Sequence, residues 1–133
     1  MSQPPPQSIL VVDPDSDFLD WADKHLRTPT TEIVCLTDAK EALGYYLEHS
    51  PDVVIAELHL SPISGMEFLK QLRLNDPNSM VLLTTGFPPT SAVIEAMRLG
   101  AFEFLRKETL TFDLRPIVDN ALRSQSEIRA TPE

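Results

Sequence analysis

The sequence is poor in cysteine and in basic residues, and it has no long hydrophobic run. Its single cysteine, Cys35, cannot form an internal disulfide, and its apolar surroundings (EIVCL) predict a buried, inert thiol. A membrane-spanning helix needs about eighteen consecutive apolar residues, and no such run occurs. The N-terminal segment MSQPPPQS lacks the basic and apolar parts of a secretory signal. These absences favour a cytoplasmic protein.

The charge balance excludes further classes of partner. Lys and Arg total 11 against 20 Asp and Glu, which gives a formal net charge of −9. Binding to nucleic acid needs clustered Lys and Arg, and anionic membranes attract basic segments. We therefore expect neither direct nucleic-acid binding nor membrane binding.

Signatures of catalysis are also missing. The segment VVDPDSDF is acidic where a phosphate-binding loop would be rich in glycine. No Ser-His-Asp or Cys-His set stands out. His25, His49 and His59 lack metal-ligand spacing, so we expect all three on the surface. We predict that the chain is not an enzyme.

Apolar runs typical of strands alternate with helical patterns along most of the chain. The length of 133 residues suits one domain. The strand-like runs are residues 8–13, 32–36, 52–57, 79–85 and 102–105. The middle three are almost continuously apolar, as expected of strands buried on both faces. Five successive βα units predict an α/β fold, with a parallel sheet covered by helices on both sides.

The two ends of the chain are polar. Residues 1–8 are rich in proline and predicted to be disordered, the domain is expected over 9–123, and residues 124–133 suit a helix end or a linker tail. Asp38, with Glu41 three residues later, predicts a helix start. Pro116 suits the first turn of the last helix if Asp113 is its N-cap.

Polar side chains follow the predicted strands where those strands end. In open parallel sheets, ligands bind beyond the carboxyl ends of the strands. The residues at these ends are Asp13 and Asp15, Glu57, Thr84 and Thr85, and Lys107. Their shared position predicts one polar site built from separated segments.

Four motifs resemble the receiver domain of two-component response regulators, over about residues 8–122. They are ILVVDPD, PDVVIAELHLSPISGMEFL, VLLTTGF and GAFEFLRK. The stretch AVIEAMRLGAFEFLRK is most similar to receivers of NtrC-type, sigma-54-dependent activators. The resemblance implies a CheY-like, flavodoxin-like (βα)5 fold, a doubly wound parallel five-stranded sheet with strand order 2-1-3-4-5.

The resemblance also implies a chemistry from which this sequence departs. In the family, an Asp after the third strand accepts a phosphoryl group from a histidine kinase, and acids after the first strand hold Mg²⁺. By position, Glu57 replaces the phosphoacceptor, Asp13 matches the first metal-binding acid, and Pro14 replaces the second. Because Pro14 offers no side-chain oxygen, Mg²⁺ binding is expected to be weak or absent. Asp15 is the neighbouring acid that could compensate.

Other family positions are retained. Thr85 and Lys107 match the residues that contact phosphoryl oxygens, and Phe104 matches an aromatic switch residue. Glu108 stands where the family has a proline in a cis bond, so we expect a trans bond after Lys107. The resemblance implies protein partners: a histidine kinase, or an effector domain such as a sigma-54-type AAA+ module. It also implies a homodimer through the face of the fourth helix, fifth strand and fifth helix.

Three interpretations of Glu57 stay open. Its longer side chain could mimic phospho-Asp and contact Thr85 and Lys107, which would make a phosphorylation-independent pseudo-receiver. The site could have drifted and left a plain docking module. A phosphoaccepting receiver could persist with Mg²⁺, although the extra methylene moves the carboxylate by about 1.5 Å, and a misplacement of ~1 Å can cost ~100-fold in rate. For the chain as a whole, the alternative function is that of a small flavodoxin-like ligand-binding protein.

Overall fold

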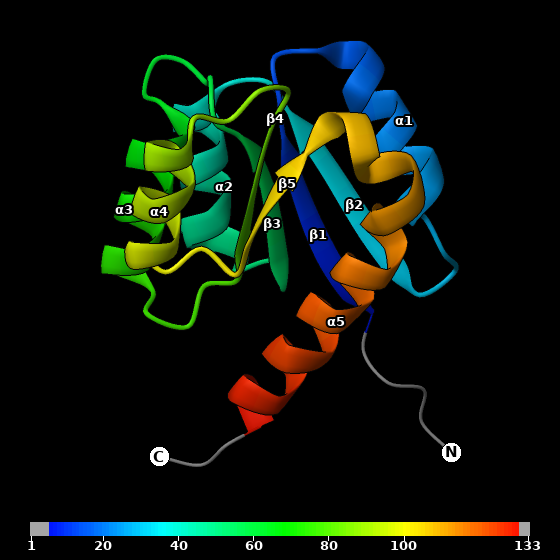
Figure 1. Ribbon diagram of the computed structural model, residues 1–133. Helices are drawn as coiled ribbons and strands as arrows, with labels where there is room; N and C mark the ends of the chain where they lie inside the picture. Colours follow the sequence, from blue (N-terminus) through cyan, green and yellow to red (C-terminus); the bar gives the residue numbers. More distant parts are fainter. Residues whose placement is uncertain (1–5, 131–133) are drawn as a thin grey trace.

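The computed structural model describes residues 6–130, with every side chain among them except those of residues 111–113. Helices and strands alternate along the chain (Figure 1). The strands are β1 (Gln7–Val12), β2 (Thr31–Leu36), β3 (Val53–Glu57), β4 (Val81–Thr85) and β5 (Glu103–Arg106). The helices are α1 (Ser16–Leu26), α2 (Ala39–His49), α3 (Gly65–Asn75), α4 (Thr90–Arg98), the 3₁₀ turn η1 (Lys107–Thr109) and α5 (Leu110–Ala130).

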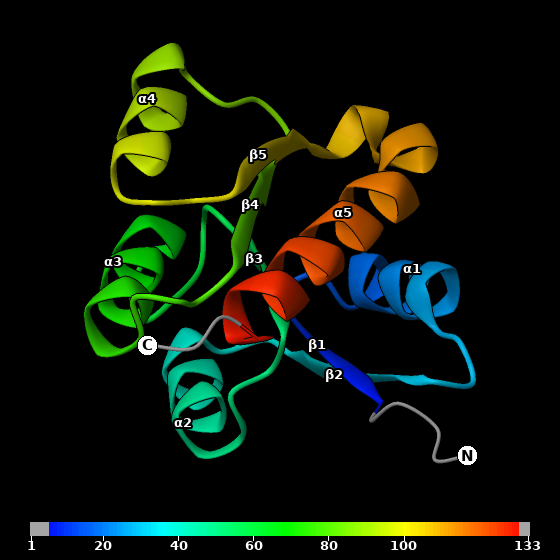
Figure 2. The ribbon, with the colours of Figure 1, turned by 90° about the horizontal axis from the view of Figure 1, so that it is seen from below.

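The strands form one parallel sheet in the order β2-β1-β3-β4-β5, which confirms the predicted topology. Alternate residues of each strand enter two separate cores. One core packs α1 and α5 against the sheet, and the other packs α2, α3 and α4 against the opposite face (Figure 2). Both faces are covered because each right-handed crossover places its helix on one of them.

The predicted strands all lie within two residues of the observed ones, but the predicted burial of β2 is wrong. β3 and β4 are buried throughout, whereas most of β2 is only half-buried. β2 is an edge strand that pairs only with β1, and the sequence alone does not tell an edge strand from a central one. Cys35 lies on this edge, so its thiol is half-buried rather than buried. Partial burial and the nearby Asp23 and Asp20 raise the pKa of that thiol.

The helix ends follow sequence signals in most places. The Asp38 side chain accepts the Glu41 amide at 2.8 Å, which confirms the predicted cap of α2. The last helix differs: α5 begins at Leu110, so a start at Asp113 is wrong and Pro116 lies inside the helix. Pro116 is exposed, and a proline inside a helix is better tolerated on the solvent side than against the core.

The N-terminal boundary also differs from the prediction. β1 begins at Gln7, so Gln7 and Ser8 are ordered strand residues and not part of a disordered segment. Residues 1–5 and 131–133 of the predicted terminal segments lie outside the described residues. None of the helices within residues 6–130 has the length and hydropathy needed to span a membrane.

Candidate functional site

The predicted polar residues gather at the carboxyl ends of four adjacent strands. Asp13 follows β1, Glu57 ends β3, Thr85 ends β4, and Lys107 follows β5 as the first residue of η1. The order β1-β3-β4-β5 places these four ends side by side, so segments separated by up to about ninety residues meet at one edge.

The strongest contact of the site is an ion pair between Lys107 and Asp13. The Lys107 Nζ lies 2.6 Å from Asp13 Oδ2, and Asp13 is only 1% exposed. The ammonium approaches outside the direction of a good hydrogen bond, so the contact is an ion pair by distance. The other carboxylate oxygen, Oδ1, accepts the Asp15 amide at 2.9 Å. Asp13 is therefore buried with both oxygens engaged by groups of this chain.

Glu57 is the less well neutralised of the two acids. Glu57 is 8% exposed, and its Oε1 lies 3.8 Å from Lys107 Nζ. Oε2 accepts the Leu58 amide at 3.0 Å, a donor that it shares with the Thr84 carbonyl. Burial raises the pKa of Glu57 above the ordinary glutamate value, and the negative charge of Asp13 adds to this; Lys107 and the Leu58 amide lower it by less. The Lys107 ammonium therefore neutralises Asp13 more than Glu57.

The comparisons with known proteins agree with this architecture. The family model described as the response regulator receiver domain matches residues 9–119. The chain belongs to the response regulator receiver domain family. Among solved structures, a response regulator receiver domain protein of Clostridium thermocellum is similar with a TM-score of 0.84 and 31% identity, over 92% of this chain and 98% of that one.

Curated relatives place the receiver in longer proteins as well as in one of similar length. The regulatory protein AtoC of Escherichia coli (strain K12) is 28% identical over 118 residues, which are 89% of this chain and 26% of AtoC. The chemotaxis protein CheY of Thermotoga maritima is 29% identical over 101 residues, 74% of this chain and 83% of that protein. The chain spans about a quarter or less of the first relatives, AtoC, DctD and LuxO.

The receiver does not make the predicted contact between Glu57 and Thr85. No hydrogen bond or ion pair joins the two within the described part of the chain. In the sheet register Glu57 is level with Thr84, so Thr85 lies one residue further along β4. The Glu57 carboxylate is instead occupied by its own following amide. Thr85 is buried, and Phe104 is half-buried against the core formed with α2, α3 and α4.

The predicted acidic pocket holds Asp13 but not Asp15. The exposed Asp15 is the N-cap of α1 and accepts the Asp17 amide at 3.0 Å. Pro14 is also exposed. Over residues 6–130, no group of three His, Cys, Asp or Glu side chains is arranged to hold a metal ion. With Lys107 against Asp13 and no oxygen from Pro14, the residues present do not fit the Mg²⁺ site of the family.

Two contributors to the site were missed by the sequence reasoning. The Lys107 ammonium lies 4.5 Å from the centroid of the Phe18 ring, a cation–π contact that supports its position beside Asp13. Gly65, at the start of α3, lies so close to the end of β3 that a Cβ there would be 2.2 Å from the Glu57 carbonyl oxygen. The contact of Phe18 could not be predicted from the local sequence, because its partner Lys107 is 89 residues away. Gly65 directly follows a helix-capping serine, and a glycine at this position is a sequence signal that another backbone segment packs closely against it.

The three histidines and the peptide bond after Lys107 match the predictions made for them. His25, His49 and His59 are exposed, as predicted. Trp21 is half-buried against the α1 and α5 core. The peptide bond between Lys107 and Glu108 is trans, as predicted from the absence of proline there.

Proposed function

We propose that this receiver is a pseudo-receiver: a regulatory protein-interaction module that acts without phosphorylation, with Glu57 as a permanent charge in place of phospho-Asp. The observation that carries the proposal is the placement of Lys107, 2.6 Å from Asp13 and 3.8 Å from Glu57. The chain's own ammonium thereby neutralises the acids that would otherwise need a bound cation.

The metal requirement of phosphoryl transfer argues in the same direction. Mg²⁺ binds through oxygen ligands in near-octahedral geometry and bridges the transferred phosphoryl group. Pro14 supplies no ligand, Asp15 caps a helix, and Asp13 is held by Lys107 and a backbone amide. Recruiting Mg²⁺ would require Asp13 to exchange a close ion pair for the metal.

The side chain of Glu57 is also poorly suited to accept a phosphoryl group. A Glu carboxylate can form acyl phosphates in principle. Here one carboxylate oxygen accepts the Leu58 amide, and Glu57 is only 8% exposed, so an incoming phosphoryl donor has little access to it. The extra methylene shifts the carboxylate by about 1.5 Å from the place of an Asp, which in-line transfer tolerates poorly.

Mimicry by Glu57 acts through Lys107 and the end of β3, and not through Thr85. One carboxylate carries less charge than a phosphoryl group and has fewer acceptor oxygens. Its partners are the Lys107 ammonium and the Leu58 amide, so the loops after β3 and β5 are tied together. The module thus keeps one arrangement of these loops for its partner.

The partner is a protein, and the face formed by α4, β5 and α5 is the proposed surface. Ile94 and Met97 on α4 are each 47% exposed, and Phe87 before this helix is 87% exposed. Exposed apolar side chains of this size suit an interface core. The partner is an effector domain, such as a sigma-54-type AAA+ module in a longer protein, a histidine kinase, or a second copy of the chain. The relative DctD is named a transcriptional regulatory protein, which supports a role in transcription regulation.

Phosphoryl labelling of a series of variants tests the proposal. Purified protein is incubated with Mg²⁺ and acetyl phosphate and its intact mass is measured. We expect no added phosphoryl group on the wild type, little on Glu57→Asp, and clear labelling of the double variant Pro14→Asp/Glu57→Asp, which restores both missing groups. Labelling of Glu57→Asp alone would assign the block to the Glu and not to the metal site. Labelling of the wild type would make the chain a phosphoaccepting receiver and refute the proposal.

A further inference from the structure

The last helix continues well beyond the packed part of the sheet. α5 has 21 residues, so it is about 31 Å long at about 1.5 Å per residue. Its last two turns, residues 123–130, pass the amino-terminal edge of the sheet, opposite the site of Glu57 (Figure 1). An unsupported helix end frays, so the contacts of these turns decide whether the helix keeps one direction.

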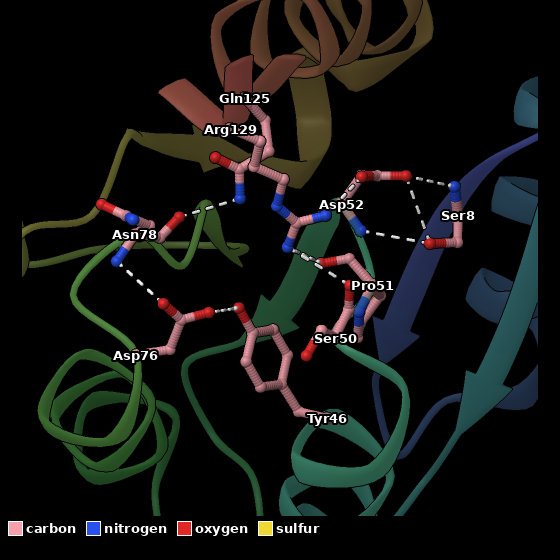
Figure 3. Close-up of polar contacts among 9 residues, drawn as sticks. All are labelled: Ser8, Tyr46, Ser50, Pro51, Asp52, Asp76, Asn78, Gln125 and Arg129. Atoms are coloured by element: carbon pink, nitrogen blue, oxygen red, sulfur yellow. Dashed lines mark hydrogen bonds and ion pairs between the residues drawn. The ribbon is translucent and has the colours of Figure 1, made fainter. Parts of the chain in front are cut away.

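Arg129 fastens the end of α5 to the loop between α2 and β3 (Figure 3). Its guanidinium pairs with the Asp52 carboxylate at 2.5 Å and donates to the carbonyls of Ser50 and Pro51 at 3.2 and 3.3 Å. The other Asp52 oxygen accepts the Ser8 amide at 2.8 Å. The Arg129 guanidinium thus pairs with a carboxylate, that of Asp52, which is itself hydrogen-bonded to Ser8 near the start of β1.

Gln125 fastens the preceding turn to the loop between α3 and β4. Its side chain has no exposed surface, and its Nε2 donates to the Asn78 carbonyl at 2.8 Å. The amide oxygen, Oε1, is buried with no hydrogen-bond partner in the described part of the chain. Burying the unpaired Oε1 destabilises the fold by at least as much as the Nε2 hydrogen bond stabilises it. Gln125 therefore contributes little to the free energy of unfolding compared with an apolar side chain of similar volume. The effect of the side-chain amide is to fix the orientation of this helix turn, because the hydrogen bond to the Asn78 carbonyl forms only when the turn is placed as observed.

The two loops held by α5 are joined to each other through α2 and α3. The Tyr46 hydroxyl of α2 donates to Asp76 at the end of α3 at 2.6 Å, and Asp76 accepts the Asn78 amide at 3.0 Å (Figure 3). Tyr46 is 1% exposed, so this link is fixed by packing as well as by hydrogen bonding. The polar contacts therefore connect the end of α5 to both loops and to the helices that precede them.

We propose that Gln125 and Arg129 form a latch that holds the last two turns of α5 in one orientation, so that the helix ends in a fixed direction relative to the sheet. The inference goes beyond the proposed function, because it holds whether or not Glu57 accepts a phosphoryl group. Since the latch engages the loops after α2 and α3, a rearrangement of either loop would change the direction of the end of α5.

Distance measurement between spin labels tests the latch in the full chain. Cys35 is replaced by Ser, and Lys40→Cys on α2 and Ala130→Cys at the end of α5 carry nitroxides, since both positions are exposed. We expect one narrow distance distribution for the parent protein. Arg129→Ala with Gln125→Leu should at least double its width, while Gln125→Leu alone should broaden it without lowering the melting temperature.

Arg123→Ala is the matched control, because Arg123 is exposed on the same turns and makes no hydrogen bond or ion pair within residues 6–130. Its distribution should equal that of the parent. An unchanged width in the double variant would overturn the latch, as would an equal broadening by Arg123→Ala. A marked loss of stability in Gln125→Leu would make Gln125 an ordinary core residue and also overturn the assignment. Asp52→Asn tests the Arg129 contact separately, should the double variant not fold.

Discussion

Replacing Lys107 by methionine removes the one lysine or arginine that, among the described residues, contacts the buried acids of the site. Asp13 is 1% exposed and its Oδ2 lies 2.6 Å from the ammonium, so Lys107→Met leaves an unpaired buried carboxylate. Glu57 loses its weaker ion pair at 3.8 Å at the same time. Methionine keeps the length and much of the packing of the lysine stem, so the lost charge dominates the effect.

The expected magnitude follows from the burial of the two partners. Breaking a fully buried ion pair costs about 3–5 kcal/mol, because one charge stays desolvated without a partner. The Lys107 side chain is 24% exposed, so water can reach the vacated space; we therefore expect a loss of about 2–3 kcal/mol in the free energy of unfolding. At about 2.1 cal/mol/K of unfolding entropy per residue, 133 residues convert this to a fall of about 7–11 °C in melting temperature.

Chemical and thermal unfolding at two pH values checks this prediction. Lys107 lowers the pKa of Glu57, so in Lys107→Met this carboxyl group takes up a proton more readily, and the deficit should be largest at about pH 8 and shrink towards about pH 5. Lys70→Met, at an exposed position on α3, is the matched control and should change stability little. A deficit below about 1 kcal/mol, equal to that of Lys70→Met, would refute the reasoning, because it would give Lys107 only the value of a surface ion pair. A deficit that does not depend on pH would contradict it too.

Two further substitutions near the site have expected outcomes. Burial raises the pKa of Glu57, so this carboxyl group binds a proton more readily in the folded protein than in the unfolded chain. Protonated Glu57 therefore stabilises the fold at pH values below the ordinary glutamate pKa of about 4.3, and this contribution is lost as the pH rises through the pKa of the folded state. Glu57→Gln should therefore unfold at higher urea than the wild type at neutral pH, with the difference vanishing in acid; a less stable Glu57→Gln at neutral pH would show that the charge is favourable there. Gly65→Ala should lose about 2–3 kcal/mol, because its Cβ would lie 2.2 Å from the Glu57 carbonyl oxygen and 2.8 Å from Leu58 Cα. Gly44→Ala, with no atom within 4 Å of its Cβ in α2, should instead gain about 0.5–1 kcal/mol in urea unfolding, and an equal loss in both variants would argue against a steric cause.

Most of the fold could be predicted from the sequence because hydrophobic runs and turn residues are local signals. The buried β3 and β4 are continuous apolar runs, and Asp38 with Glu41 marks the start of α2. The exposure of β2 could not be predicted, since the order of strands in the sheet decides which strand is an edge. The start of α5 was misjudged because Pro116 suits a first turn, but on the solvent side it is tolerated further inside a helix.

The site was predictable in its membership but not in its pairing. Topology alone brings Asp13, Glu57 and Lys107 to one edge of the sheet. Which acid pairs closely with the ammonium depends on a difference of about 1 Å between the two distances, 2.6 and 3.8 Å, and on the Phe18 ring, and neither can be read from the sequence. Asp15 was placed in the pocket because it is acidic, whereas the geometry of the first turn of α1 makes it a helix cap.

The central claim is that Glu57 acts as a permanent charge and accepts no phosphoryl group. Its most direct test is the intact mass of the wild-type chain after incubation with Mg²⁺ and acetyl phosphate, with the Pro14→Asp/Glu57→Asp variant in the same series as the positive control. We predict an unchanged mass for the wild type under conditions that label the variant. The addition of one phosphoryl group to the wild type, mapped to Glu57, would contradict the account.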